Sequence, residues 1–115
     1  MAQAEPNFRD AWLAAFREGQ RFDGYVNWRP RAAAWVRQNL DEFTLRAVQN
    51  LLYEHVLAGG ELDQVRERRE GWQDRFPHHF DVRLEILGRS VYVETVLLQT
   101  DLTNPGVEIV NVHEA

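Results

Sequence analysis

The stretch from residue 80 to residue 99 constrains the fold of this chain most, because its residue pattern predicts a β-hairpin. Apolar and charged residues alternate from residue 80 to residue 86, which is the period of two expected for a strand with one buried face. Gly88 and Arg89 predict a two-residue turn, with glycine at the position that a type II′ turn favours. Residues 90–99 then form the returning strand, and residues 107–113, which follow the turn-forming residues 103–106, form a third.

Three helices are predicted in the first half of the chain. Apolar residues recur at helical spacing between Pro6, which suits a first turn, and Gly19, which suits a helix end. A second helix is expected over residues 30–38. Asp41 is the expected N-cap of a third helix, which Gly59 and Gly60 terminate.

Two segments leave alternatives open. Residues 21–28 are consistent with a short strand or an extended arm, and residues 62–69 with a short helix or a charged surface turn. The length of 115 residues suits one domain spanning residues 1–115. The predicted fold is therefore α+β, with N-terminal helices packed on one face of a C-terminal antiparallel β-sheet.

Composition excludes several kinds of chemistry. The chain has no cysteine, and all of its 13 basic residues are arginine. Disulfides, thiolate nucleophiles, lysine Schiff bases and a phosphate-loop lysine are therefore excluded. The net charge of −5 argues against broad, sequence-independent binding to nucleic acid. Four arginines against one acid between residues 21 and 40 nevertheless allow a local basic patch.

The location of the protein is predicted from what its sequence lacks. The N-terminal residues show neither the basic start nor the apolar stretch of a signal peptide. No apolar run approaches the ~20 residues that a membrane span needs. We therefore expect a cytoplasmic protein that does not associate with a membrane.

The predicted hairpin places polar side chains together on the face of the sheet that the helices leave open. Counting outward from the turn sets Arg83 opposite Glu94 and Glu85 opposite Tyr92. Asn111 and His113 join this face if the third strand presents its odd positions there. The odd positions also include Val107 and Ile109, so the sequence leaves this choice open.

These side chains have two interpretations. Arg83 and Glu94 are consistent with an ordinary cross-strand ion pair on a solvated sheet, which contributes roughly 0.2–1 kcal/mol. Alternatively, they form a site that cleaves phosphodiesters. Glu94 would then accept the proton of a ribose hydroxyl, Arg83 would stabilise the phosphate charge, and His113 would protonate the leaving oxygen.

Further residues are candidates for binding the substrate. Tyr92, Asn111 and His79 are expected around the same phosphate position, and one residue of the His78-His79 pair is an alternative proton donor. A polar entry into the strand is the other interpretation of that pair. No two histidines stand at helical metal-binding spacing, so neither a metal nor another cofactor is expected.

The tryptophans divide into two pairs. Trp12 and Trp35 lie in helical patterns and are expected in the core. Trp28 and Trp72 stand beside breaks, where an aromatic ring can stack on a base or cover an edge of the core.

From about residue 22 onward, the chain resembles the RelE/ParE toxin superfamily of bacterial toxin–antitoxin systems. The likeness lies in a short strand leading into "WRPRAAAWVRQNL", the helix "DEFTLRAVQNLLYEHVLAGG", and the strands "HHFDVRLEILGRSVYVETVLL" and "VEIVNVHEA". It implies a RelE-like core over residues 21–115, with residues 1–20 as an additional helix. It also implies cleavage of mRNA on the ribosome, an antitoxin partner, and a functional arginine at the hairpin, where Arg89 stands.

The chain departs from this family in two respects. RelE-type toxins are usually basic, whereas this chain is acidic, and "VHEA" replaces the basic and aromatic residues expected at the end of the chain. A non-catalytic protein-interaction module is therefore an alternative function, as an accessory, inhibitory or antitoxin-like protein. In that case an exposed third strand at the edge of the sheet could accept a strand from a partner.

Overall fold

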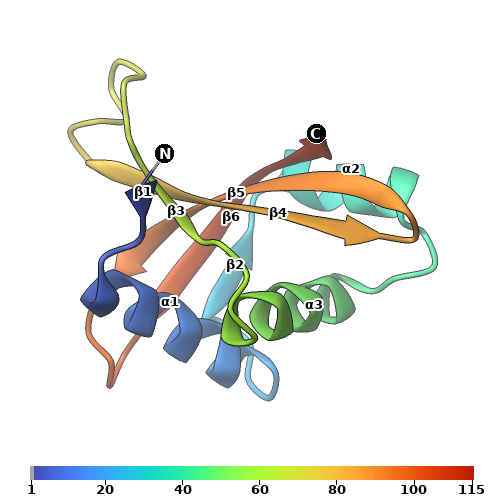
Figure 1. The fold of residues 1–115 in the computed structure, drawn as a ribbon, viewed down its shortest axis with the longest axis horizontal. Coiled ribbons are helices and arrows are strands. Elements are labelled where there is room, and N and C mark those ends of the chain that lie inside the picture. Colours follow the sequence, from blue (N-terminus) through green and yellow to red (C-terminus); the bar gives the residue numbers. More distant parts are fainter. Residues whose placement is uncertain (1) are drawn as a thin grey trace.

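A mixed six-stranded sheet forms the centre of the protein, whose computed structural model describes residues 2–115 (Figure 1). The strand order is β1-β3-β4-β5-β6-β2. The helices are α1 (Pro6–Gly19), α2 (Pro30–Asn39) and α3 (Leu45–Leu57). The strands are β1 (Ala2–Gln3), β2 (Val26–Trp28), β3 (Asp63–Arg66), β4 (His78–Ile86), β5 (Arg89–Gln99) and β6 (Gly106–Glu114).

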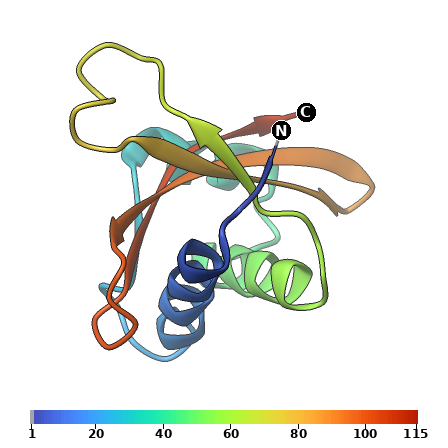
Figure 2. The same cartoon turned by 60° about the vertical axis from the view of Figure 1, so that its left-hand side comes forward.

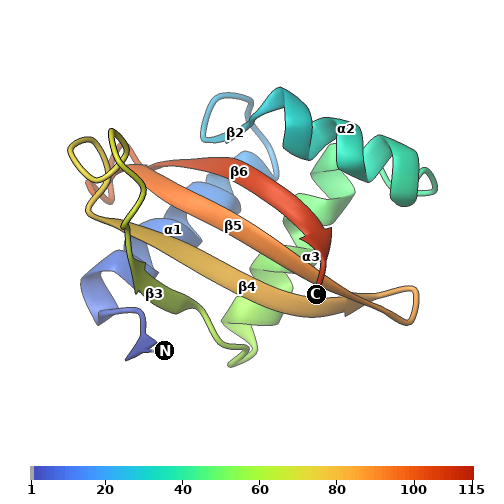
Figure 3. The same ribbon diagram turned by 90° about the horizontal axis from the view of Figure 1, so that it is seen from above.

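The helices do not all cover the same part of the sheet. Figure 2 shows α1 and α3 side by side beneath one face. Figure 3 shows α2 running along the β6 side of the sheet. The opposite face, called the open face below, carries no helix, and the loop between β3 and β4 (residues 67–77) rises on that side.

The N-terminal helix is part of the core. Trp12 and Phe16 of α1 are fully buried, and their rings stack with centroids 4.0 Å apart. The indole Nε1 of Trp12 donates to Thr95 Oγ1 at 3.0 Å, and that hydroxyl donates to the Phe80 carbonyl oxygen at 2.6 Å. The indole N–H of Trp12 and the hydroxyl of Thr95 thus both have partners, and this chain of hydrogen bonds fixes α1 against β4 and β5.

The α+β class predicted from the sequence is confirmed, but three details are wrong. The sheet is mixed because β2 pairs with β6 in parallel. Residues 63–66 form β3, because they pair with the outer edge of β4, where a helix or turn was predicted. Thr44, not Asp41, caps α3: its Oγ1 accepts the Ala47 N–H at 3.0 Å.

The third strand of the predicted sheet, β6, is not a free edge along its whole length. Residues Val107, Glu108 and Ile109 pair with β2. The expectation that this strand accepts a partner strand is therefore wrong for this part of β6. Within residues 2–115, no helix combines the length and apolar character needed to cross a bilayer.

Candidate functional site

The turn between β4 and β5 sets the register of the hairpin. Leu87 and Gly88 occupy the turn, both with positive φ (54° and 76°), which corresponds to a type I′ turn. The predicted turn at Gly88-Arg89 is therefore wrong by one residue, and the pairing is shifted by two. Because side chains alternate with a period of two, a shift by two leaves every residue of the hairpin on its predicted face.

The shift changes which side chains lie opposite one another. Asp81 lies opposite Glu94, and Arg83 lies opposite Tyr92. The predicted cross-strand pair of Arg83 and Glu94 is therefore absent. The open face still carries Asp81, Arg83, Tyr92 and Glu94 together, as the alternation predicts.

A β-bulge in β6 settles which residues of that strand face the site. Val107 and Ile109 lie opposite Leu97 and Thr95, on the face that α1 covers, and both are fully buried. The register then shifts, so that Asn111 lies opposite Glu94 and His113 lies opposite Tyr92. The extra residue reverses the alternation. The choice that the sequence left open therefore falls on Asn111 and His113 at the open face.

The β3–β4 loop covers one end of the open face. Phe76 packs on Val96 and Val110 with Trp72 beside them, which forms a small second cluster apart from the main core. The Glu67 N–H donates to the Pro77 carbonyl oxygen at 2.9 Å and closes the loop. The sequence does not predict that this loop packs over the sheet. The available signal was the presence of two aromatic residues, Trp72 and Phe76, within a charged connector.

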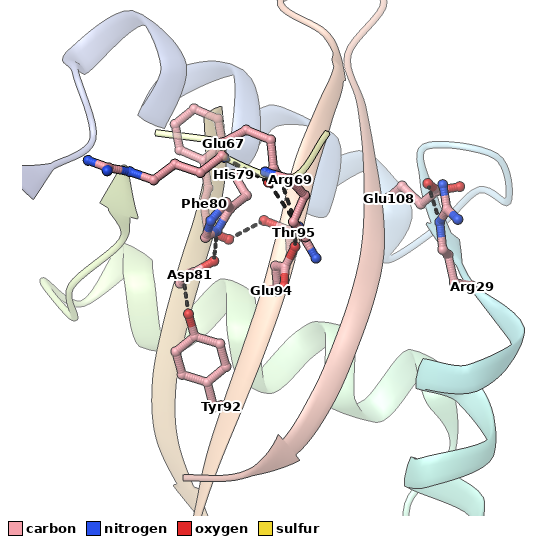
Figure 4. Close-up of polar contacts among 11 residues, drawn as sticks. Arg29, Glu67, Arg69, His79, Phe80, Asp81, Tyr92, Glu94, Thr95 and Glu108 are labelled. Atoms are coloured by element: carbon pink, nitrogen blue, oxygen red, sulfur yellow. Dashed lines mark hydrogen bonds and ion pairs between the residues drawn. The ribbon is translucent and has the colours of Figure 1, made fainter. Parts of the chain in front are cut away.

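Glu94 lies beneath this loop. Its residue is 7% exposed, and its carboxylate accepts from Arg69 Nη2. Arg69 also donates to Glu67 from Nε at 2.9 Å and from Nη2 at 2.7 Å. These bonds link two buried carboxylates through one guanidinium (Figure 4). A general base needs access to its substrate, and the Glu94 side chain is only 9% exposed in this arrangement.

The buried position of Glu67 is stabilised by its donors. The hydrogen bond from the Arg69 side chain is the main cause that lowers the pKa of Glu67 to about 2, against the opposing effect of burial. The backbone N–H groups of Arg68 and Arg69 add two further bonds, at 3.0 and 2.9 Å. Glu67 is therefore ionised throughout the neutral range.

Asp81 organises a second group of polar side chains. It is 2% exposed; its Oδ1 lies 2.7 Å from His79 Nδ1, and its Oδ2 accepts the Tyr92 hydroxyl (Figure 4). Burial and this bond raise the pKa of Tyr92 well above its usual value, so the phenol stays protonated. For His79, burial alone would lower the pKa, but the hydrogen bond and charge of Asp81 outweigh it and raise the pKa.

His113, Tyr92 and Arg83 form an accessible row across β6, β5 and β4. The His113 and Tyr92 rings stack with centroids 4.9 Å apart and planes at 20°, and Arg83 Cζ lies 5.4 Å from the Tyr92 ring centroid. His113 Nδ1 lies 2.8 Å from the Glu114 carbonyl oxygen, which can only accept, so Nδ1 carries the hydrogen. In the neutral ring, Nε2 is then left as a proton acceptor.

Arg89 does not join this row. It lies opposite Ile86, on the other face of the hairpin from Arg83. Its Nη1 donates to the Asn39 carbonyl oxygen at 2.8 Å, at the end of α2, and its Nε donates to Glu114 at 2.8 Å. A cation at this position satisfies a helix C-terminus, so Arg89 ties the hairpin to α2.

A solvent-accessible hollow of about 360 Å³ lies beside the part of the open face that the β3–β4 loop covers. We call it the arginine hollow. It is lined by Arg29, Pro30, Arg31, Arg69, Trp72, Val110 and Asn111. Its walls come from the start of α2, from the β3–β4 loop and from the bulge in β6. Three distant parts of the sequence thus meet there.

Comparison with protein-family models, curated proteins and solved structures gives no match for this chain. Among the described residues, no group of three or more His, Cys, Asp or Glu side chains is arranged to hold a metal ion.

Proposed function

We propose that this protein is a RelE-like domain that acts on RNA at Arg83, Tyr92 and His113 on the open face. The observation that carries the proposal is the stacked, accessible pair of His113 and Tyr92 with the Arg83 guanidinium beside it. An imidazole with a free Nε2 and a guanidinium, each lying against the same tyrosine ring, would supply proton transfer and charge stabilisation to a phosphate bound across this row.

The proposed cleavage needs one proton carrier. His113 Nε2 takes the proton of a ribose 2′-hydroxyl, and the 2′ oxygen attacks the adjacent phosphorus. The bond from phosphorus to the 5′ oxygen breaks, and the imidazolium gives its proton to that oxygen. The products are a 2′,3′-cyclic phosphate and a 5′-hydroxyl end. Arg83 stabilises the charge on the phosphate oxygens, and Tyr92 holds the imidazole by stacking.

The order of elements supports this proposal. The segments that carry the resemblance fold as β2, α2, α3, β4, β5 and β6, in the order quoted for the family. Asn111 lies on the open face two residues before His113 and is a candidate contact for the substrate. Glu94 and Arg89 are assigned to structural roles instead, because both bind other parts of the protein.

The test is incubation of the purified protein with a mixed-sequence RNA, alone and with translating ribosomes. We expect His113→Ala and Arg83→Gln to reduce cleavage by at least about 100-fold, the size typical for removal of an acid–base group or charge stabiliser. Tyr92→Phe keeps the ring under His113 and should retain cleavage. Unchanged cleavage by His113→Ala would contradict the site.

A non-catalytic interaction module is the second candidate, and the internal bonds of Glu94 and Arg89 favour it. Two of the four residues first considered catalytic are occupied in holding the fold together. If the protein is such a module, it leaves RNA intact both alone and with translating ribosomes. It then binds a protein, such as an antitoxin, in a fixed ratio. Mass measurement of the protein purified from its natural host tests this, and a free monomer there counts against it.

A further inference from the structure

The arginine hollow collects positive charge on an acidic protein. Arg29 and Arg31 flank the first residue of α2, and Arg69 reaches in from the β3–β4 loop. No carboxylate is among the residues that line the hollow. The partners of two of these arginines lie outside it: Glu108 for Arg29, and the buried pair beneath the loop for Arg69.

Part of each guanidinium is left for a ligand. Arg29 bonds to Glu108 through Nε at 3.0 Å, and Arg69 uses Nε and Nη2 for its carboxylates. Within residues 2–115, both Nη atoms of Arg29, Nη1 of Arg69 and the whole guanidinium of Arg31 make no hydrogen bond that meets ordinary geometric criteria. Guanidinium donors of this kind suit the oxygens of a phosphate.

Trp72 positions two of the three arginines. The Cζ atom of Arg29 lies 4.3 Å from its ring centroid, and that of Arg69 lies 5.3 Å from it. Attraction between a cation and an aromatic ring restricts both side chains before any ligand arrives. Less conformational entropy is then lost on binding.

The start of α2 adds to the positive potential in the arginine hollow. No side chain caps this helix, and Pro30 at its first position has no N–H. Arg29, Pro30 and Arg31 all line the hollow, so the positive end of the helix borders it, where it favours an anion.

The hollow lies next to the proposed site for RNA. Asn111 lines it, and His113 follows on the same face of β6, two residues further on. Two residues of a strand span roughly 7 Å, which is about the length of one nucleotide in an extended chain.

We propose that the arginine hollow binds a phosphate of an RNA chain whose neighbouring nucleotide lies at His113. This inference rests on the proposed function for its choice of ligand. It adds the place where the substrate is held, and it assigns Arg29, Arg31 and Arg69 to binding and Trp72 to their positioning.

The test measures binding without cleavage. The probe is a fluorescein-labelled, mixed-sequence RNA octamer with 2′-O-methyl groups, which has no 2′-hydroxyl to attack. Arg31→Gln removes the arginine that has no partner in the described structure. Arg37→Gln is the matched control, because it removes the same charge from an exposed position of the same helix.

We expect Arg31→Gln to weaken binding about tenfold and Arg37→Gln less than twofold. The slope of log affinity against log salt should fall by about 0.7 for Arg31→Gln, because one phosphate contact is lost. Trp72→Leu should weaken binding through the loss of positioning, while its salt slope stays near that of the unaltered protein.

The outcomes separate this inference from the proposed function. Arg31-dependent binding of the octamer, with no cleavage of ordinary RNA, supports the hollow and refutes the nuclease. Cleavage that depends on His113, with equal binding by Arg31→Gln and Arg37→Gln, refutes the hollow alone. Adenosine monophosphate and inorganic phosphate serve as competitors. If either competes as well as an unlabelled octamer, the ligand is a free phosphate compound and the assignment to RNA is overturned.

Discussion

Replacement of Arg69 by methionine is expected to lower the free energy of unfolding at pH 7 by about 2–3 kcal/mol. Arg69 is the side-chain partner of Glu67 and Glu94, whose side chains are 1% and 9% exposed. Methionine keeps most of the side-chain length and removes the charge. Glu94 then loses its partner, whereas Glu67 keeps the two backbone N–H groups that donate to it.

The magnitude follows from burial and exposure together. Removal of one partner from a fully buried ion pair costs about 3–5 kcal/mol, because the remaining charge is left without compensation. The Arg69 side chain is 46% exposed, so solvent already screens part of its interaction. Hydrogen bonds to charged groups contribute about 1.5–3 kcal/mol each. The expected loss of about 2–3 kcal/mol therefore lies at or below the lower end of the range for a fully buried ion pair.

The effect should depend on pH in a defined direction. The pKa of Glu67 lies at about 2 in the folded protein, below its ordinary value of 4.5. A carboxylate with a lowered pKa contributes stability that is fully present above about pH 4.5 and is lost as the pH falls towards 2. The difference in stability between the unaltered protein and the methionine variant should therefore narrow below about pH 4.5.

Urea unfolding at pH 7, 5 and 4 measures this difference. Arg68→Met is the control, because Arg68 is exposed and contributes its backbone N–H, which the substitution retains, to Glu67. A second substitution, Glu94→Gln, should recover stability in the Arg69→Met protein and reduce it in the unaltered protein. If Arg69→Met and Arg68→Met unfold at the same urea concentration, the proposed ion-pair network does not stabilise the fold.

Three further substitutions test local features by thermal or urea unfolding. Leu87→Asn should stabilise the protein by about 1 kcal/mol, because asparagine tolerates the positive φ of this turn position better than leucine. Gly60→Ala should destabilise it by about 1–3 kcal/mol, because an added Cβ would lie 2.5 Å from ring atoms and the carbonyl oxygen of His55. Thr95→Val should cost about 1–3 kcal/mol, because it leaves the buried indole N–H of Trp12 without an acceptor.

Each of these has a matched control. Leu102→Asn also removes an exposed leucine, but at a position without positive φ, and should be nearly neutral. Gly106→Ala places its Cβ at ordinary contact distances, the nearest being 3.5 Å, and should cost less than Gly60→Ala. Thr95→Ser keeps the hydroxyl and should retain most of the stability that Thr95→Val loses. Equal effects within any pair would contradict the corresponding explanation.

The sequence predicts the faces of the hairpin better than its pairs. A period of two identifies which side chains share a face, and a slip by two residues leaves that assignment intact. The turn itself was misassigned because glycine marks only one of its two positions, and Leu87 carries no signal of positive φ. The residue opposite Glu94 in the hairpin, which is Asp81 and not Arg83, was misassigned for the same reason, because cross-strand pairing depends on register.

The elements that the sequence could not predict depend on contacts between distant segments. β3 has only four residues, and they form a strand because an unpaired edge of β4 is beside them. The β3–β4 loop is rich in charge and predicts a solvated connector. Its covering role depends on Phe76 meeting Val96 and Val110, and the same loop carries the Arg69 that binds Glu94.

The bulge in β6 lets one strand place its odd-numbered side chains on opposite faces of the sheet before and after the bulge. Before it, Val107 and Ile109 serve the interior, and after it, Asn111 and His113 serve the solvent side. Without this register shift, simple alternation onward from Ile109 would turn Asn111 and His113 towards the helices. Val112 still belongs to the core, but Asn111 and His113 can vary in sequence without disturbing the interior. These two positions are where new chemistry could be introduced at least cost to folding.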